Sequence, residues 1–447
     1  MTRSAIIGGV LVALAVGGAA AAFAVIWRPA IAVIDPPAAQ VFPPELVKRG
    51  RDLAAIGNCN ACHTARGGRN FAGGVAVPTP FGTIFSSNIT PDAETGIGRW
   101  SEAAFRRAMR EGVARDGRHL YPTFPYDHFT NVSDQDDTAL YAYLMTREPI
   151  RASSPVNQLS FPFDQRFVVA GWKLLFLRRE VYHADPARSA EWNRGAYLVE
   201  GLAHCGACHT PRNALGAERA GAAFSGADVE NWQAYAINAR SSSPVPWDAD
   251  ALFGYLRNGW HPDHGTARGP MAQVVAGLSS VPPDDVRAIA TYMASVFGPA
   301  APDRVRRPQT ASSQPEPLSG DHVPGASIYM AACAPCHENG RAVPYGGIDL
   351  GLSTAISSPE PRNLANIVLS GVAPVEGERS PIMPGFAESM NDGQIAALLS
   401  YLRARFSDQP AWAGVEKTVE QARQFGTGLL RTASAPNPLK PTQRDKP

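Results

Sequence analysis

All six cysteines of the chain lie in three copies of one short pattern, Cys-x-x-Cys-His. The copies are Cys59, Cys62 and His63; Cys205, Cys208 and His209; and Cys333, Cys336 and His337. Two thiols on one helical turn can reach the two vinyl groups of a haem, and the next histidine can bind its iron. A disulfide or zinc site is the alternative, but zinc motifs lack this adjacent histidine in three equivalent units. The pattern predicts three covalently bound haem c groups with histidine as the proximal ligand.

The chain is too long, at 447 residues, for a single core. A helical pattern precedes each motif and another closes each repeat, which indicates tandem units of similar structure. The opening patterns are Glu45 to Ile56, Ala190 to Leu202 and Gly325 to Ala332, and the closing patterns are Ser133 to Met145, Pro282 to Val296 and Asn391 to Arg405. We therefore expect a mainly α fold with three tandem cytochrome c-type domains and an N-terminal transmembrane helix.

The helical patterns and connectors divide the chain into seven segments. We predict a membrane anchor and linker (1–44), a first module (45–150), a connector (151–186), a second module (187–298), a Pro-rich linker (299–321), a third module (322–408), and an amphipathic segment with a disordered tail (409–447). The apolar run Phe167 to Leu177 in the connector predicts a packed surface helix or, alternatively, a helix at a membrane interface or partner. The tail pattern predicts an interrupted amphipathic helix, disordered from Ala433 onward.

The first residues indicate the compartment. Ala5 to Trp27 form a stretch of 23 residues without charge, which is long enough to span a bilayer. A cleaved signal peptide is the alternative, since Ala19 to Ala22 could supply a cleavage site. Because haem is attached to c-type cytochromes after export, we expect an inner-membrane anchor with the haem domains in the periplasm. The 41 basic and 40 acidic residues nearly cancel, which gives no sign of nucleic-acid binding.

The ligand on the second face of each iron decides between electron transfer and ligand chemistry. Met383 stands in a Pro-rich loop before the third closing helix, and Met271 follows Gly269-Pro270 before the second. Both are predicted distal ligands, although methionine is more often a core residue. His261 and His264 are the alternatives in the second module.

The first module departs from this pattern. Phe124, which cannot bind iron, stands where the second module has Met271. His128 follows four residues later and is the tentative distal ligand, which would give a lower-potential site. His119, Met109 and an open iron are the remaining alternatives.

Several further motifs resemble one family along nearly the whole chain. They are the run from Gly82 through Ser87-Asn88-Ile89-Thr90-Pro91 to Trp100, the segment Tyr121 to Tyr126, and the run Ala207 to Asn213. These resemble the three-haem membrane-bound cytochrome c subunits of periplasmic bacterial dehydrogenases. Alcohol and gluconate dehydrogenase cytochromes usually have methionine at the position of Phe124. A narrower resemblance, to cytochromes paired with molybdenum hydroxylases, is carried by Phe124 with His128, the segment Phe161 to Leu177, and Pro246-Trp247 with Gly269-Pro270-Met271.

This resemblance implies a role in a larger complex. A molybdopterin subunit would oxidise an aldehyde or N-heterocycle, a 2Fe-2S subunit would pass the electrons on, and this chain would deliver them to ubiquinone or a terminal oxidase. The chain would then be an electron carrier that is not catalytic alone. The alternatives are the cytochrome subunit of a flavin- or PQQ-dependent dehydrogenase, a cytochrome subunit of a terminal oxidase, or a multihaem peroxidase.

Overall fold

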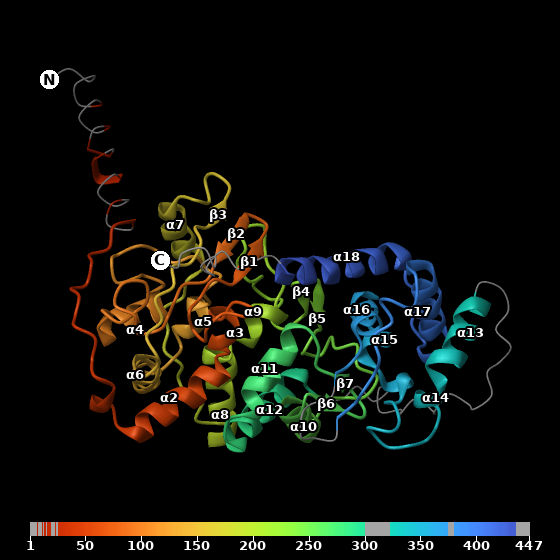
Figure 1. Cartoon of the computed structure of the whole chain (residues 1–447). Helices are drawn as coiled ribbons and strands as arrows, with labels where there is room; N and C mark the ends of the chain where they lie inside the picture. Colours follow the sequence, from red (N-terminus) through yellow and green to blue (C-terminus); the bar gives the residue numbers. More distant parts are fainter. Residues whose placement is uncertain are drawn as a thin grey trace, which may run out of the picture. The chain divides into compact units, whose positions relative to one another are not determined.

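A computed structural model describes residues 26–299, 322–373 and 380–434, together with isolated positions between 7 and 23 (Figure 1). The fold is mainly α-helical and forms two compact units. Unit 1 comprises Met1–Ala207, Arg212–Gly221 and Ser280–Ile289, and unit 2 comprises Cys208–Pro211, Ala222–Ser279 and Ala290–Pro447. Helices α9 (Cys205–His209) and α12 (Pro283–Phe297) have residues in both. The boundaries of three separate modules stay a prediction.

Unit 1 is built on a close crossing of two helices, α2 (Pro44–Ile56) and α6 (Asp134–Met145). Both confirm predicted helices. They meet at Gly50, where an added Cβ would lie 1.9 Å from the carbonyl oxygen of Ala139 and 2.7 Å from the Cβ of Tyr143. Only glycine lets the two backbones approach this closely. Leu53 and Leu140 are buried beside the crossing and begin the hydrophobic core.

Short elements surround this pair of helices in unit 1. They are η1 (Ala39–Val41), α3 (Cys59–His63), α4 (Glu102–Glu111), α5 (Tyr126–Phe129) and a three-stranded antiparallel sheet of β1 (Ala76–Thr79), β2 (Gly82–Phe85) and β3 (Gln158–Leu159). The strand pairing places Ala76 opposite Phe85 and Gly82 opposite Leu159. The hydrophobic pattern did not predict these strands, because each is too short to show an alternation.

The predicted connector helix is α7 (Arg166–Phe176). It packs through a buried lysine, Lys173, whose ammonium donates to the carbonyl oxygens of Glu111 (2.7 Å) and Gly112 (2.5 Å) at the end of α4. Burial lowers the pKa of this lysine to about 7. Leu174 and Leu175 point outward and are exposed.

The helix predicted for Ala190 to Leu202 is interrupted. It forms α8 (Ala190–Tyr197) and a π-helical turn, η2 (Leu198–Leu202), in which Gly201 has non-helical angles (φ −102°, ψ −105°). Four charged side chains of unit 1 join α8 to α2, α6 and α12. Arg49 bonds Asp136 at 3.2 Å and lies 3.8 Å from Asp285, while Arg194 bonds Asp285 at 2.7 Å and lies 3.7 Å from Asp136.

Unit 2 contains the body of the second module. Its elements are the hairpin β4 (Ala227–Val229) and β5 (Trp232–Ala234), α10 (Ala249–Asn258), the hairpin β6 (Trp260–His261) and β7 (Gly265–Thr266), and α11 (Pro270–Ser279). The closing helix α12 confirms the pattern predicted from Pro282. The helix α11 was not predicted.

Unit 2 also contains the third module. Its elements are α13 (Val323–Ala332), α14 (Ala334–His337), η5 (Leu350–Leu352), α15 (Thr354–Ser357), α16 (Arg362–Ser370) and α17 (Asp392–Phe406). The crossing of α13 and α17 repeats the one in unit 1, since a Cβ at Gly325 would lie 2.2 Å from the carbonyl oxygen of Ala397. Asn391 and Gln394 form a reciprocal capping box at the start of α17.

The last helix, α18 (Val415–Ser434), packs on α16 and α17. The prediction of an interrupted helix is wrong here, because the helix is continuous. Its buried residues Val415, Val419 and Ala422 recur at intervals of four and three, which keeps one face on the core.

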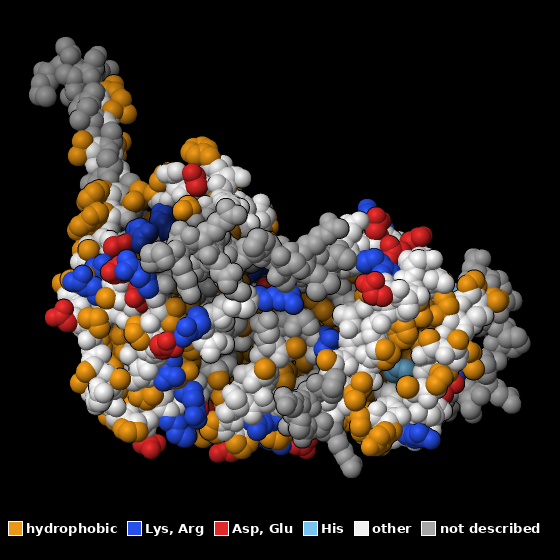
Figure 2. All heavy atoms as spheres, in the orientation of Figure 1, with side chains coloured by type: hydrophobic (Ala, Val, Ile, Leu, Met, Phe, Trp, Pro, Cys, Tyr) orange, Lys and Arg blue, Asp and Glu red, His pale blue; other side chains and the backbone are white. Residues whose placement is uncertain are grey.

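Several predicted segments lie mainly or wholly outside the described residues. They are the anchor Ala5 to Trp27, the linker 299–321 and the tail beyond residue 434. Within the described part of the chain, no helix combines the length and apolar character needed to cross a membrane. On the face drawn in Figure 2, basic and acidic side chains are interspersed, in keeping with a net charge of +1.

Replacing Gly50 with alanine is expected to destabilise the protein. The new methyl group would overlap the backbone of α6, and overpacking of this kind costs about 1–3 kcal/mol. The matched control is Gly171→Ala on α7, where nothing lies within 4 Å of the added Cβ. The control should raise the thermal unfolding midpoint slightly, because alanine favours a helix. An unchanged midpoint in Gly50→Ala would show that the crossing is not tightly packed.

Candidate haem-binding sites

Each Cys-x-x-Cys-His motif forms one helical turn. The first is α3 and the second is α9, while the third spans Cys333 and α14. The residue before the first cysteine has a left-handed backbone in two of them, Asn58 (φ 50°) and His204 (φ 38°). In the third, α13 runs directly up to Cys333. The six cysteines form no disulfide with one another.

The three motif histidines each make the same kind of hydrogen bond. Each donates its Nδ1–H to a backbone carbonyl oxygen: His63 to Ser87 (2.7 Å), His209 to Tyr235 (2.7 Å) and His337 to Ile348 (2.9 Å). Such a bond fixes the tautomer and orientation of the ring and leaves the Nε2 lone pair for a metal. The same arrangement at all three motifs fits proximal ligation of haem iron.

Burial shifts the pKa of all three motif histidines in the same direction. Desolvation is the largest effect on each ring and lowers the pKa of His63, His209 and His337. The neutral imidazole, which is the form that binds a metal, is therefore favoured. These residues fit haem c, whose iron supplies the redox change between its ferrous and ferric states when bound.

The loop of Met383, the predicted distal ligand of the third site, is held by the backbone. Met383 and Val372 exchange two hydrogen bonds, of 2.9 and 2.8 Å, in an isolated antiparallel bridge. Gly371 (φ 69°) lies against this bridge, and a Cβ there would be 2.4 Å from the carbonyl oxygen of Met383. The side chain of Met383 packs on the core of the third module.

Met271, the predicted distal ligand of the second site, is the second residue of α11. The preceding Gly269 (φ 57°) packs on Trp232, where a Cβ would lie 2.5 Å from the indole. The alternative His264 is buried, stacks on Trp247 with ring centroids 3.5 Å apart, and lies 3.0 Å from the hydroxyl of Ser243 through Nδ1. The alternative His261 accepts a hydrogen bond from the backbone of Asp263.

His128, the tentative ligand of the first site, is buried and has partners at both ring nitrogens. Nε2 lies 2.7 Å from a carboxylate oxygen of Glu218, and Nδ1 lies 3.0 Å from the carbonyl oxygen of Glu200. Burial disfavours the charged ring, but Glu218 outweighs it and raises the pKa of His128 to about 9. With both nitrogens donating, neither offers a lone pair to iron. These bonds count against the predicted role of His128.

His119, an alternative ligand, is also occupied. Its Nε2 bonds the carbonyl oxygen of Ile26 at 2.9 Å, and its Nδ1 lies 3.1 Å from the ammonium of Lys173. The other alternative, Met109, is buried in the core on α4.

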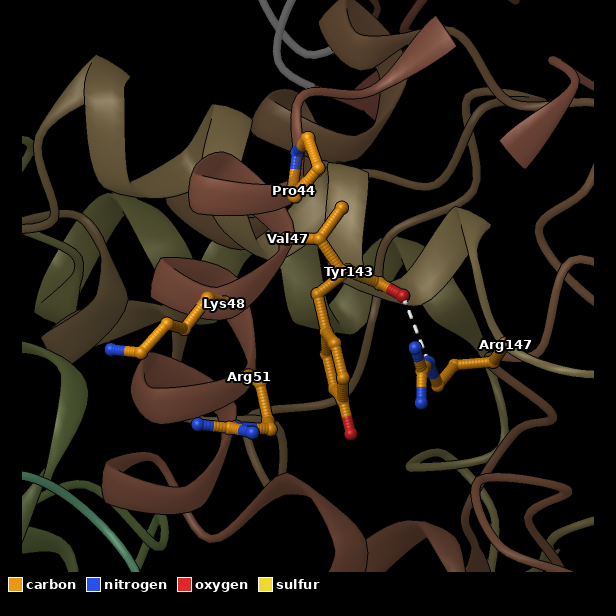
Figure 3. A pocket seen from close by; sticks show the side chains of 6 residues that line it. All are labelled: Pro44, Val47, Lys48, Arg51, Tyr143 and Arg147. Atoms are coloured by element: carbon orange, nitrogen blue, oxygen red, sulfur yellow. Dashed lines mark hydrogen bonds between the residues drawn. The ribbon is translucent and has the colours of Figure 1, made fainter. Parts of the chain in front are cut away.

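A pocket of about 410 Å³ in unit 1 contains none of the motif residues (Figure 3). Pro44, Val47, Lys48 and Arg51 of α2 line it together with Tyr143 and Arg147. Arg147 donates to the carbonyl oxygen of Tyr143 at 3.1 Å and lies over the Tyr143 ring. The pocket therefore lies beside the α2–α6 crossing, apart from the Cys-x-x-Cys-His motifs.

The carbonyl partners of the three motif histidines were not predicted. In the first two sites the carbonyl belongs to the segment just after a hairpin, since Ser87 follows β2 and Tyr235 follows β5. A backbone carbonyl carries no residue-type signal, so only the predicted position of a hairpin after each motif could have indicated it.

The fold and these sites define a c-type cytochrome. Residues 47–148 match the cytochrome c family model, and residues 320–402 match the model for subunit III of cbb3-type cytochrome c oxidase. Cytochrome c domains imply covalently bound haem c.

Relatives that match most of the chain show which kind of c-type cytochrome it is. The chain is 36% identical to the gluconate 2-dehydrogenase cytochrome c subunit of Pantoea cypripedii, covering 86% of this chain and 90% of the relative. It is also 36% identical to the fructose dehydrogenase cytochrome subunit of Gluconobacter japonicus, over 85% and 83%. The chain therefore belongs to the family of dehydrogenase cytochrome c subunits, and its role is electron transfer.

A third relative is more similar in sequence. This relative, a nicotinate dehydrogenase subunit of Pseudomonas putida, is 47% identical over 404 residues, which is 89% of this chain. The chain spans only about a third (33%) of the length of that relative.

The three motifs predict three covalent haems per chain. The intact mass of the purified protein should exceed that of the polypeptide by three haems, and the double replacement of Cys59 and Cys62 by serine should remove one. The same result is expected for the pair Cys205 and Cys208 and for the pair Cys333 and Cys336. A wild-type protein that carries only two haems would contradict the count.

Proposed function

We propose that the chain is a three-haem electron carrier of a dehydrogenase complex at the inner membrane, with its haem domains in the periplasm. The observation that carries the haem count is the Nδ1–carbonyl bond that recurs at His63, His209 and His337. A shared proximal geometry at three attachment turns supports three equivalent cofactors. The chain is not catalytic alone in this proposal.

We further propose Met271 and Met383 as the distal ligands of the second and third haems. A glycine with positive φ packs closely on its surroundings beside each of them, Gly269 before Met271 and Gly371 against the bridge of Met383. These glycines help to fix the path of the backbone at the methionine. A thioether ligand raises the reduction potential, so these two haems would be the high-potential carriers.

The proposed donor is a molybdopterin-containing dehydrogenase with a 2Fe-2S subunit that oxidises an aldehyde or N-heterocycle. The motif resemblance and the 47% identity to a nicotinate dehydrogenase subunit support it, since nicotinate is an N-heterocycle. The proposed acceptor is ubiquinone or a terminal oxidase. A flavin- or PQQ-dependent dehydrogenase is the competing donor, as the fructose, gluconate and alcohol dehydrogenase relatives suggest.

Met271→Leu and Met383→Leu should each convert one low-spin haem to a high-spin form and lower its reduction potential, because leucine supplies no sulfur ligand. Electron paramagnetic resonance of the ferric protein and a redox titration measure both effects. The matched controls are Met293→Leu, buried on α12, and Met390→Leu, which packs on the same hydrophobic core as Met383. The proposed ligands would be contradicted if Met293→Leu or Met390→Leu changed the haem spin state and Met271→Leu or Met383→Leu left it unchanged.

The donor and the location can be tested in one preparation. Detergent-solubilised membranes containing the tagged full chain should yield a complex with molybdenum and a 2Fe-2S signal. An aldehyde or N-heterocycle should reduce its haems under anaerobic conditions. Replacement of residues 1–27 with a cleavable signal peptide should keep export and haem attachment and move the haem protein to the soluble periplasmic fraction.

Two outcomes would overturn parts of this proposal separately. Recovery of a flavin or quinoprotein dehydrogenase alone would contradict the molybdenum donor. Release of the full chain from cells by osmotic shock would contradict the membrane anchor and leave the donor assignment intact.

A further inference from the structure

The first and second modules contain the same loop in the same register. α4 and α10 end at left-handed glycines, Gly112 (φ 58°) and Gly259 (φ 77°). Each glycine carbonyl accepts a 2.7 Å hydrogen bond from the amide eight residues later, Leu120 or Ala267. The bridge pairs inside the two loops also correspond, since Val113 pairs with His119 and Trp260 pairs with Thr266.

This register fixes which residues are equivalent after the loop. Met271 lies four residues beyond Ala267, and Phe124 lies four residues beyond Leu120. The equivalence rests on backbone hydrogen bonds of this chain and is independent of side-chain identity. Phe124 therefore occupies the place from which Met271 is proposed to bind iron.

Phe124 is held in that place by packing. It lies against the hydrophobic core of the first module, a cluster that Cys59 also contacts. Its ring meets Phe129 edge-on with centroids 5.3 Å apart. Phenylalanine has no lone pair, so this side chain can cover an iron and cannot bind it.

The other potential donors of the first module, residues 45–150, are engaged elsewhere. Besides His63, this range contains the histidines and methionines Met109, His119, His128 and Met145. His119 and His128 have partners at both ring nitrogens. Met109 and Met145 are buried on α4 and α6, at 6% and 3% exposure, and neither belongs to the loop that carries Phe124.

We infer that none of the described side chains of residues 45–150 binds the first haem iron opposite His63. Phe124 instead lies over the vacant side of that iron, which a small neutral diatomic ligand such as carbon monoxide or nitric oxide can occupy. This rests on the proposed haem assignment. The ferrous iron would bind such a ligand directly, without displacing a protein group. The first haem would also lack the thioether that raises the potential of the other two.

The test uses the full-length protein with its haems. Ferric wild-type protein should show one high-spin haem per chain by electron paramagnetic resonance, and the reduced protein should bind one carbon monoxide per chain. Phe124→Met should supply a ligand, convert that haem to the low-spin form, raise its potential and abolish carbon monoxide binding. The conservative Phe124→Leu should keep the high-spin haem and its carbon monoxide binding.

Other outcomes would overturn the inference. Wild-type protein with every haem low-spin and no carbon monoxide binding would contradict it. Appearance of a new high-spin haem in His128→Gln or Met109→Leu would then identify the residue that binds the iron. An intact mass that shows no haem at Cys59 and Cys62 would instead contradict the proposed haem count. Failure of the haem count can therefore be told apart from failure of the inference about the first haem iron.

Discussion

The close crossing of the opening and closing helices is the contact on which the haem sites depend. In the first module Gly50 lets α2 lie on the backbone of α6, and in the third Gly325 does the same for α13 and α17. Each attachment turn follows its opening helix almost at once, because Cys59 comes three residues after α2 and Cys333 directly after α13. In these two modules the crossing therefore sets the position from which the cysteines and the motif histidine extend.

The elements that could be predicted from the sequence are those with local signals. The closing helices begin at capping residues, Ser133 and Asn391, which bond the backbone amides of Asp136 and Gln394. The attachment motifs are equally local. The carbonyl that orients His63 could not be predicted, because a backbone group has no residue-type signal. The partner of His128 could not be predicted either, because Glu218 is 90 residues away along the chain. Long-range pairing leaves no periodic trace in a single sequence.

In the proposed assignment, the two sides of each haem site are specified differently. The proximal side uses the same bond three times and depends on a backbone carbonyl, so substitutions of side chains there change it little. The distal side depends on one residue at a fixed place in a loop, Phe124 or Met271, and in the third module on the bridge that holds Met383. In that assignment one fold carries haems of different potential, because a single substitution in the distal loop changes the iron ligand while the proximal hydrogen bond is kept.

The residues that precede the first two attachment turns are in contact within unit 1. His204, which directly precedes Cys205, lies 3.3 Å from the carbonyl oxygen of Gly57 through its Nε2, and Gly57 is two residues before Cys59. Leu202 covers Gly57, and Phe129 meets the ring of His204 edge-on at 5.6 Å. A path from Cys205 to Cys59 therefore runs through the His204 side chain, one hydrogen bond and the backbone of Gly57 and Asn58. The ion pairs of Arg49 with Asp136 and of Arg194 with Asp285 hold the helices that precede these turns together within unit 1.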